Sequence, residues 1–206
     1  FDPIHLGHLR TAFEVLHALR LAEVRFVPAG DPPHRPAPRV AARQRLELVR
    51  AAVADQDGFV VDAREVRRAG PSYSVLTLGE LRRELPATPL CLIVGMDAFL
   101  GLPGWHRWQE LLELAHLVVA PRPGWRAPAD GVLGELLAAR SATNSAALHA
   151  AAAGHILIQP VTQLEISSTE LRESLAAGRD PRYLVPEAVR EAIVRTRCYS
   201  VSQPTR

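Results

Sequence analysis

The chain has 206 residues, of which 48% are hydrophobic and 22% charged; this balance supports one substantial core and excludes disordered and fibrous classes. Its 24 basic and 22 acidic residues give a net charge of +2 and are interspersed, whereas nucleic-acid binders usually gather basic residues on one face. No apolar run approaches the roughly 20 residues of a bilayer span. We therefore expect no nucleic-acid partner and no membrane partner.

The elements alternate along the chain. Apolar spacings of three and four residues predict helices over residues 8–20, 40–54, 74–85, 105–114, about 131–153, 168–177 and 186–195. Short β-branched and apolar runs predict strands over residues 24–28, 59–62, 90–94, 117–120 and 156–158. Proline and glycine predict loops over residues 30–38 and 121–128.

Strands that alternate with helices indicate βαβ units. The expected fold class is therefore α/β, with a doubly wound, mainly parallel sheet and helices on both faces. We expect one domain over residues 1–199 and a polar C-terminal tail over residues 200–206. In such a sheet, ligands bind beyond the carboxyl ends of the strands.

Two histidines flank a glycine near the start, in the segment Asp2-Pro3-Ile4-His5-Leu6-Gly7-His8. Residues three apart lie on one side of a helical turn, and Gly7 lets a ligand approach the backbone closely. A helix N-terminus also attracts negative charge. The alternatives are two surface histidines or half of a zinc site, for which only Asp2 is a nearby further ligand. The pattern favours an anion site.

A second polar cluster lies near the other end of the chain, at Ile166-Ser167-Ser168-Thr169-Glu170-Leu171-Arg172. Ser167 and Glu170 have the spacing of a capping box, which predicts a helix start. Ser168 and Thr169 could bind phosphate oxygens, and Arg172 could add a forked pair of charged hydrogen bonds. An ordinary cap with a solvated arginine explains this cluster equally well. A nucleoside triphosphate is long enough to touch both clusters.

The lysine and cysteine content excludes some kinds of catalytic site and indicates the redox compartment. Every basic residue is arginine, so a Schiff-base lysine and a P-loop lysine are excluded. The two cysteines, Cys91 and Cys198, stand far apart and in no metal-ligand spacing. This favours a reduced, cytoplasmic compartment.

The segment Phe-Asp-Pro-x-His-x-Gly-His at residues 1–8, together with Ile-Ser-Ser-Thr-x-x-Arg at 166–172, resembles the signature pair of the HxGH nucleotidyltransferase superfamily. Other segments resemble the bacterial nicotinate-nucleotide adenylyltransferases: PAGDPPHR at 28–35, GPSYS at 70–74, GMDA at 95–98, LPGW at 102–105 and YLVP at 183–186. The resemblance spans essentially the whole chain and implies a Rossmann-like nucleotidyltransferase fold.

The resemblance implies adenylyl transfer from ATP to nicotinate mononucleotide, which gives nicotinate adenine dinucleotide and pyrophosphate in NAD biosynthesis. The mononucleotide's phosphate attacks the α-phosphorus directly, so catalysis consists of positioning and charge stabilisation. Mg²⁺ would accompany ATP and bridge its phosphate oxygens, with no metal ligands expected from the protein.

By the motif match, the implied catalytic residues are His5, His8 and Arg172. The implied ATP-binding residues are Phe1, Asp2, His5, Gly7, His8, Gly95, Asp97, Ser167, Ser168, Thr169 and Arg172. His8 would stabilise charge on the α-phosphate, while Arg172 and its cluster would hold the β- and γ-phosphates. Gly95 and Asp97 would meet the ribose of the adenosine.

The resemblance also implies residues that bind the mononucleotide. Trp105 would stack on the nicotinate ring, and the backbone N–H groups of Tyr73 and Ser74 would bind the ring's carboxylate. His34 and Arg35 would lie near the mononucleotide phosphate, with Arg45 in support. The alternatives are a core tryptophan for Trp105 and a solvated helix arginine for Arg45.

Two other functions stay open. One is a related adenylyltransferase whose acceptor is nicotinamide mononucleotide or phosphopantetheine, although the PPHR, SYS and LPGW segments argue against phosphopantetheine. The other is a nucleotide-binding protein without catalysis, against which the intact His5, His8 and Arg172 argue.

The family carries a strand and a Gly-Gly-x segment before Phe-Asp-Pro. We therefore expect this sequence to lack the first strand of the native domain. That would leave a vacant strand position beside Val24–Pro28, flanked by unpaired edges.

Overall fold

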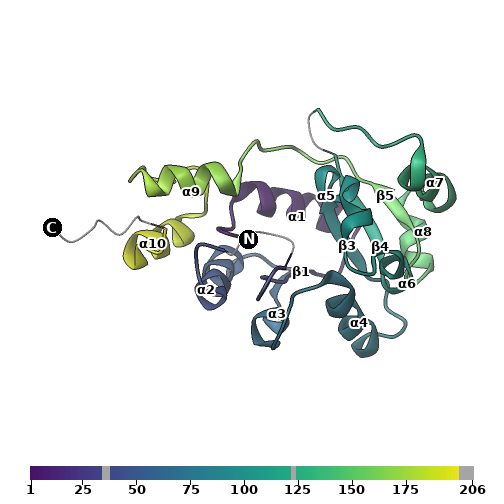
Figure 1. Ribbon diagram of the computed structural model, residues 1–206, viewed down its shortest axis with the longest axis horizontal. Coiled ribbons are helices and arrows are strands. Elements are labelled where there is room, and N and C mark those ends of the chain that lie inside the picture. Colours follow the sequence, from purple (N-terminus) through teal and green to yellow (C-terminus); the bar gives the residue numbers. More distant parts are fainter. Residues whose placement is uncertain (34–37, 122–123, 200–206) are drawn as a thin grey trace. The chain divides into compact units, whose positions relative to one another are not determined.

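The structure is a computed structural model that describes residues 1–33, 38–121 and 124–199 (Figure 1). The chain forms two compact units. The first unit comprises Phe1–Ser72 together with the chain from Leu164 onward, and the second comprises Tyr73–Gln163. Each unit has its own parallel sheet and its own helices, and each is described by itself.

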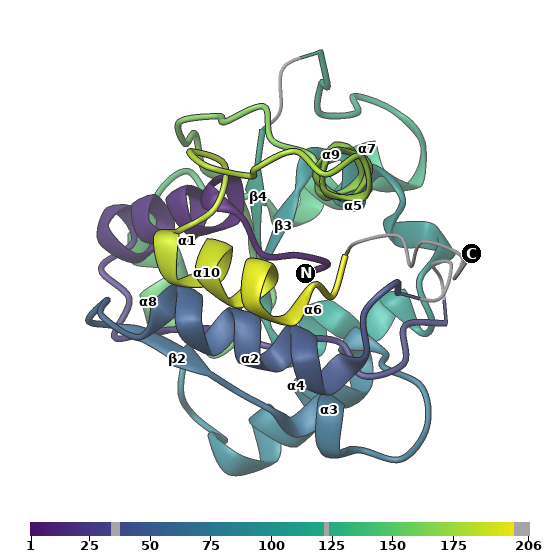
Figure 2. The same ribbon diagram turned by 90° about the vertical axis from the view of Figure 1, so that its left-hand side faces the viewer.

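The first unit contains two parallel strands, β1 (Val24–Phe26) and β2 (Phe59–Val61). Burial alternates along β1, as expected for a strand with one face on a core. Its helices are α1 (Leu6–Ala18), α2 (Ala42–Val53), α3 (Arg64–Arg67), α9 (Ser168–Ala176) and α10 (Glu187–Thr196). Helix α10 packs against α2, so the end of the described chain lies beside an N-terminal helix (Figure 2).

The second unit contains three parallel strands in the order β3 (Cys91–Gly95), β4 (His116–Ala120) and β5 (Ile156–Ile158). All five residues of the central strand β4 are buried, as is typical of a parallel strand covered on both faces. The helices are α4 (Ser74–Glu84), α5 (Met96–Leu100), α6 (Leu111–Leu114), α7 (Gly131–Arg140) and α8 (Ser145–Ala150), with 3₁₀ turns η1 (Leu102–Gly104) and η2 (Trp108–Glu110).

In each strand pair named above the two strands are parallel, and strands alternate with helices along the chain. This pattern confirms the α/β class. None of the helices in the described ranges is long and apolar enough to cross a membrane. The predicted tail over residues 200–206 lies outside the described residues. The expectations of one domain and of a missing first strand stay predictions.

The helix predicted over residues 105–114 is wrong in its first half. Pro103 and Gly104 belong to the 3₁₀ turn η1, and Trp105 after it is extended. Arg107 then adopts a left-handed conformation with φ 53°, which interrupts a right-handed helix. Only the last four residues of the predicted span, Leu111–Leu114, are α-helical.

The alanine-rich helix predicted over about 131–153 is interrupted. The chain leaves α7 at Ser141, and the next residue, Ala142, donates its N–H to the carbonyl of Ile156 at 2.8 Å. Asn144 then caps α8 by accepting the N–H of Ala146 at 3.0 Å. Asparagine is a preferred N-cap residue, so its side chain marks a helix start that apolar spacing alone does not reveal.

In the second unit, Arg82 of α4 joins several loop segments through their carbonyl groups. Its Nη2 donates to the carbonyls of Leu114 and Ala152, both at 2.7 Å. Its Nη1 donates to the carbonyls of Leu85 at 2.9 Å and Thr88 at 2.8 Å. A planar guanidinium with five donors suits such a junction.

We expect Arg82→Met to lower the free energy of unfolding by about 2 kcal/mol, because hydrogen bonds to charged groups contribute more than neutral ones. The neighbouring Arg83 is exposed and donates to one carbonyl, that of Gly79, at 3.3 Å. Arg83→Met is therefore the matched control, with an expected change within about 0.5 kcal/mol. Urea unfolding followed by circular dichroism compares the two variants, and equal losses would contradict this role of Arg82.

Candidate active site

The first cluster forms the beginning of helix α1. His5 precedes the helix in an extended conformation, and its carbonyl accepts the N–H of His8 at 3.0 Å and of Leu9 at 3.3 Å. The N–H of Leu6 has no acceptor within the helix, and it donates to the carbonyl of Leu184 at 3.0 Å. The helix begins two residues earlier than its predicted start at His8, which places Gly7 and His8 in its first turn.

The two histidine rings lie against each other, with centroids 3.7 Å apart. His5 is buried with 4% exposure, while His8 is half-buried. The N–H of His5 donates to Nδ1 of His8 at 3.3 Å. Because Nδ1 accepts, the hydrogen-bond network assigns the proton of a neutral His8 ring to Nε2. That N–H can bind an anion at the helix N-terminus.

Gly7 brings the first turn of α1 close to the ring of His5. A Cβ atom at this position would lie 3.0 Å from Nδ1 of His5 and 3.4 Å from the carbonyl oxygen of Leu164. From the sequence, Gly7 is expected to let a ligand approach the backbone closely. The structure adds a packing reason, since a side chain here would press on the His5 ring.

Phe1 covers another side of the histidine pair. Its ring meets His8 edge-on with centroids 4.9 Å apart and contacts Phe26 of β1 at 5.9 Å. Edge-to-face contacts of this kind are favourable. Phe1 therefore helps to orient the His8 ring.

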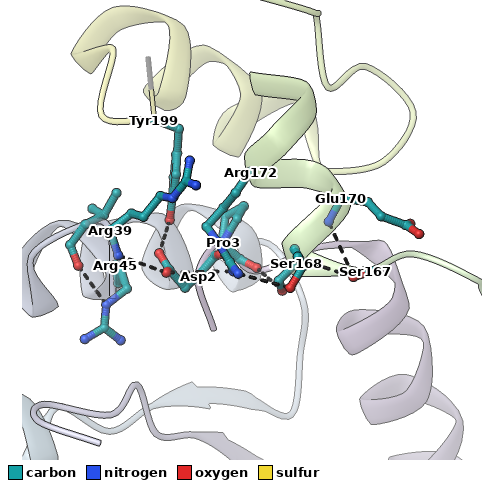
Figure 3. Close-up of polar contacts among 11 residues, drawn as sticks. Asp2, Pro3, Arg39, Arg45, Ser167, Ser168, Glu170, Arg172 and Tyr199 are labelled. Atoms are coloured by element: carbon teal, nitrogen blue, oxygen red, sulfur yellow. Dashed lines mark hydrogen bonds and ion pairs between the residues drawn. The ribbon is translucent and has the colours of Figure 1, made fainter. Parts of the chain in front are cut away.

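The second cluster forms the beginning of helix α9, as predicted. Oγ of Ser167 accepts the N–H groups of Thr169 at 3.2 Å and Glu170 at 3.5 Å, so Ser167 caps the helix. Oγ of Ser168 donates to the carbonyl of Pro3 at 3.1 Å. Nη1 of Arg172 donates to the carbonyl of Asp2 at 2.8 Å, and its Nη2 donates to Oγ1 of Thr169 at 3.0 Å (Figure 3).

These contacts bring two clusters from opposite ends of the chain together within the first unit. The alternative of a solvated arginine does not describe Arg172, whose side chain is 22% exposed and bonded to the N-terminal segment. The result is two helix N-termini, two imidazoles and one guanidinium in neighbouring segments. Such a donor set is suited to an elongated anion.

The carboxylate of Asp2 is held by protein groups. Its Oδ1 accepts the hydroxyl of Tyr199 at 2.8 Å, and its Oδ2 accepts the N–H of Arg39 at 3.2 Å. Nη1 of Arg172 lies 3.9 Å from Oδ2. The predicted contact between Asp2 and ATP stays a prediction.

Arg45 of α2 is buried, with 3% exposure. Its Nε donates to the carbonyl of Val40 at 3.0 Å, and its Nη2 donates to those of Ala29 at 2.7 Å and Gly30 at 3.2 Å. Burial lowers the pKa of its guanidinium, and the charge of Asp2 opposes that shift. The alternative of a solvated helix arginine is therefore wrong, because Arg45 fixes both ends of the predicted loop over residues 30–38.

His34 and Arg35 lie outside the described residues, but the segment leading to them is well bonded. The N–H of Gly30 donates to Oγ of Ser72 at 2.9 Å, and the N–H of Ser72 donates to the carbonyl of Asp31 at 2.7 Å. A Cβ at Gly30 would lie 2.2 Å from the carbonyl oxygen of Glu65, so only glycine fits. These contacts join Gly30 and Asp31 of the PAGDPPHR segment to Ser72 of the GPSYS segment within the first unit.

In the second unit, the adenosine-binding residues inferred from the motif lie at the end of a strand. Gly95 is the last residue of β3, and Asp97 lies exposed in the first turn of α5. Ligands in parallel α/β sheets bind at this carboxyl end of the strands. The predicted ribose contact itself stays a prediction.

The residues expected at the nicotinate ring also lie in the second unit. Tyr73 precedes α4 and Ser74 is its first residue, so their backbone groups belong to a helix N-terminus, where N–H donors lack intrahelical acceptors. The ring of Tyr73 stacks on that of His106 with centroids 4.3 Å apart. Trp105 is half-buried and packs against the core of this unit. Its predicted stacking on the nicotinate ring stays a prediction.

Sequence reasoning missed several groups that support the first cluster. Tyr199, the N–H of Arg39 and the carbonyl of Leu184 all bind the segment Asp2–Leu6. Two of these are backbone groups, which carry no residue-type signal. Tyr199 stands next to the predicted polar tail, and no spacing in the sequence relates it to Asp2.

Comparison with known proteins fits this geometry. Residues 1–174 match the model of the cytidylyltransferase-like family, a stretch that contains both clusters. The chain belongs to this family. A protein of Halorhodospira halophila, named "Probable nicotinate-nucleotide adenylyltransferase", is 54% identical over 203 residues, which cover 98% of this chain and 93% of that protein. A protein of the same name from Aeromonas salmonicida is 52% identical over 193 residues, covering 94% and 90%.

Solved structures show the same fold. The Plasmodium falciparum nicotinic acid mononucleotide adenylyltransferase complexed with NaAD matches this cytidylyltransferase-like chain with a TM-score of 0.72 and 13% identity, covering 97% of this chain and 93% of that one. At this identity the match concerns the fold alone. Together with the parallel α/β units, it confirms the Rossmann-like nucleotidyltransferase fold. The names of the relatives confirm the family resemblance that the motifs predicted.

Proposed function

We propose that this chain transfers the adenylyl group of ATP to nicotinate mononucleotide, giving nicotinate adenine dinucleotide and pyrophosphate in cytoplasmic NAD biosynthesis. The observation that carries this proposal is the contact of Asp2 and Pro3, which lead into the His5–His8 segment, with Ser168 and Arg172 in the first unit. Relatives with that name at 52% and 54% identity support the choice of acceptor. A nucleic-acid or membrane partner has no place in this reaction.

The reaction needs no nucleophile from the protein. An oxygen of the mononucleotide's phosphate forms a bond to the α-phosphorus of ATP as the bond to the bridging oxygen breaks, and pyrophosphate leaves with that electron pair. His8 donates its Nε2 proton in a hydrogen bond to an α-phosphate oxygen and stabilises the charge there. His5 supports the ring of His8 by the tilted contact of its own ring and by its backbone N–H.

The leaving group is held by the beginning of α9. The side chains of Ser168 and Thr169 exchange their contacts with Pro3 and Arg172 for the β- and γ-phosphates, and Arg172 adds a planar cationic fork. These contacts stabilise pyrophosphate as negative charge moves onto it. Binding both phosphates also aligns the α-phosphorus for attack.

The acceptor and the nucleoside use other segments. Gly95 and Asp97 meet the ribose of the adenosine, while Trp105 stacks on the nicotinate ring, whose carboxylate accepts the N–H groups of Tyr73 and Ser74. The mononucleotide phosphate is bound by His34 and Arg35. Arg45 contributes through the backbone that it fixes at Ala29 and Val40.

Mg²⁺ would enter with ATP and would neutralise part of the triphosphate charge. Within the described ranges, no group of three or more His, Cys, Asp or Glu side chains lies together as a metal site. The nearest carboxylate of the signature, Asp2, is bonded to Tyr199 and Arg39. This donor set fits a cation whose ligands are phosphate oxygens and waters, as Mg²⁺ prefers in nucleotide sites.

Pyrophosphate release from ATP tests the function with three acceptors in parallel: nicotinate mononucleotide, nicotinamide mononucleotide and phosphopantetheine. We expect kcat/KM for the acid to exceed that for either alternative by tenfold or more. A tenfold preference for the amide or for phosphopantetheine would overturn the assignment. ATP binding without turnover on any acceptor would instead indicate a catalytically silent nucleotide-binding protein.

A further inference from the structure

Tyr199 reaches the nucleotide signature from the far end of the chain. It lies three residues beyond α10, which ends at Thr196, and it is buried with 4% exposure. Its hydroxyl donates to Oδ1 of Asp2 at 2.8 Å (Figure 3). The match to the family model ends at residue 174, so the family signature itself gives Tyr199 no role.

Asp2 connects this tyrosine to the phosphate-binding groups. Its carboxylate accepts from Tyr199 and from the N–H of Arg39, and its backbone carbonyl accepts Nη1 of Arg172. The next residue, Pro3, accepts the hydroxyl of Ser168 through its carbonyl. A shift of the backbone at Asp2 therefore acts on the docking of α9 as well as on the entry into α1.

Because Asp2 is negatively charged, the orientation of its carboxylate affects the binding of a triphosphate. A carboxylate that turns towards bound triphosphate opposes it, whereas one held against Tyr199 and Arg39 leaves the cationic and N–H donors to act on the phosphates. The side chain of Asp2 is 18% exposed, so water replaces a lost protein partner poorly. Burial and the charge of Asp2 raise the pKa of Tyr199 far above its ordinary value, which keeps its hydroxyl a donor.

We propose that Tyr199 is a positioning residue for adenylyl transfer: its hydroxyl holds the Asp2 carboxylate and, through Asp2, the arrangement of Arg172 and the His5–His8 segment that receives ATP. The expected effect of Tyr199 on the rate of adenylyl transfer rests on the proposed function. Its expected effect on the affinity for ATP does not depend on which acceptor the enzyme uses.

Tyr199→Phe removes the hydroxyl and retains the buried ring. We expect the affinity for MgATP, measured by isothermal titration calorimetry on the full chain without acceptor, to fall about tenfold, as for the loss of a hydrogen bond to a charged group. The melting temperature should stay within about 4 °C. Tyr183→Phe is the matched control, because Tyr183 is 83% exposed and lies outside the proposed machinery, so its affinity for MgATP should not change.

Asp2→Ala completes a double-mutant cycle, because alanine cannot accept the hydroxyl of Tyr199. If Tyr199 acts through Asp2, then Tyr199→Phe costs little further affinity for MgATP in the Asp2→Ala background. Unchanged affinity in Tyr199→Phe, or losses in the two variants that simply add, would overturn the proposal. So would a melting temperature lowered by more than about 10 °C with no selective loss of ATP affinity, since that result describes a structural role only. The proposed function is tested separately, by wild-type turnover on each acceptor. The double-mutant cycle uses only affinities for MgATP, so a failure of one test can be told from a failure of the other.

Discussion

Replacing His8 with alanine is expected to lower kcat for adenylyl transfer by about 10³, because removal of one preorganised donor to a developing oxyanion costs about 10² to 10³. The ring of His8 is oriented by the N–H of His5 at its Nδ1, by a tilted contact with the His5 ring and by an edge-on contact with Phe1. These contacts fix where Nε2 points before ATP binds. Steady-state pyrophosphate release at saturating substrates measures the loss.

Two further variants separate the role of Nε2 from that of the ring as a whole. His8→Asn keeps an acceptor near the position of Nδ1 and removes the Nε2 donor, so it should fold like the wild type and be as slow as His8→Ala. His17→Ala removes an exposed histidine from the last turn of the same helix and should retain full activity. A His8→Asn variant with near-full turnover would show that Nε2 does not stabilise the α-phosphate.

The sequence predicted the two ends of the site because side-chain chemistry and local spacing are both visible there. The cap at Ser167 and the helical turn from His5 to His8 depend on neighbours within four residues, and the family resemblance supplied the link between the two. Short β-branched and apolar runs also predicted the five strands, although β1 ends at Phe26 rather than at the predicted Pro28. Local patterns of this kind predict the folded structure because the apolar residues that define them are the residues that the sheet buries.

Long-range contacts to backbone groups could not be predicted in the same way. The sequence leaves Arg45 either as a support of the mononucleotide phosphate site or as a solvated helix arginine, and neither interpretation predicts its partners, the carbonyls of Ala29, Gly30 and Val40, which have no sequence signature. The same holds for the carbonyl of Leu184 at the start of α1. The break at Arg107 depends on a left-handed conformation that arginine rarely adopts. The apolar spacing does not reveal this break, so the predicted helix included Arg107.

Arg172→Met is the second substitution with a large expected effect. We expect kcat/KM for ATP to fall by about 10² to 10³, since the variant loses the fork that binds leaving pyrophosphate while it keeps the apolar stem. It also loses the hydrogen bonds to the carbonyl of Asp2 and to Oγ1 of Thr169. The loss should appear in both kcat and KM, because Arg172 binds phosphates in the ground state and during transfer.

Arg172→Lys distinguishes charge from geometry at this position. An ammonium supplies one point charge and cannot reach Asp2, Thr169 and a phosphate with a planar fork, so we expect it to recover about tenfold of the activity lost in Arg172→Met. Arg179→Met, which removes an exposed arginine just beyond α9 that bonds to Ser174, should leave kcat/KM unchanged. If Arg172→Met keeps more than a tenth of the wild-type kcat/KM, the leaving phosphates are held elsewhere. In that case the contact of Arg172 with Asp2 serves to dock α9 on the N-terminal segment.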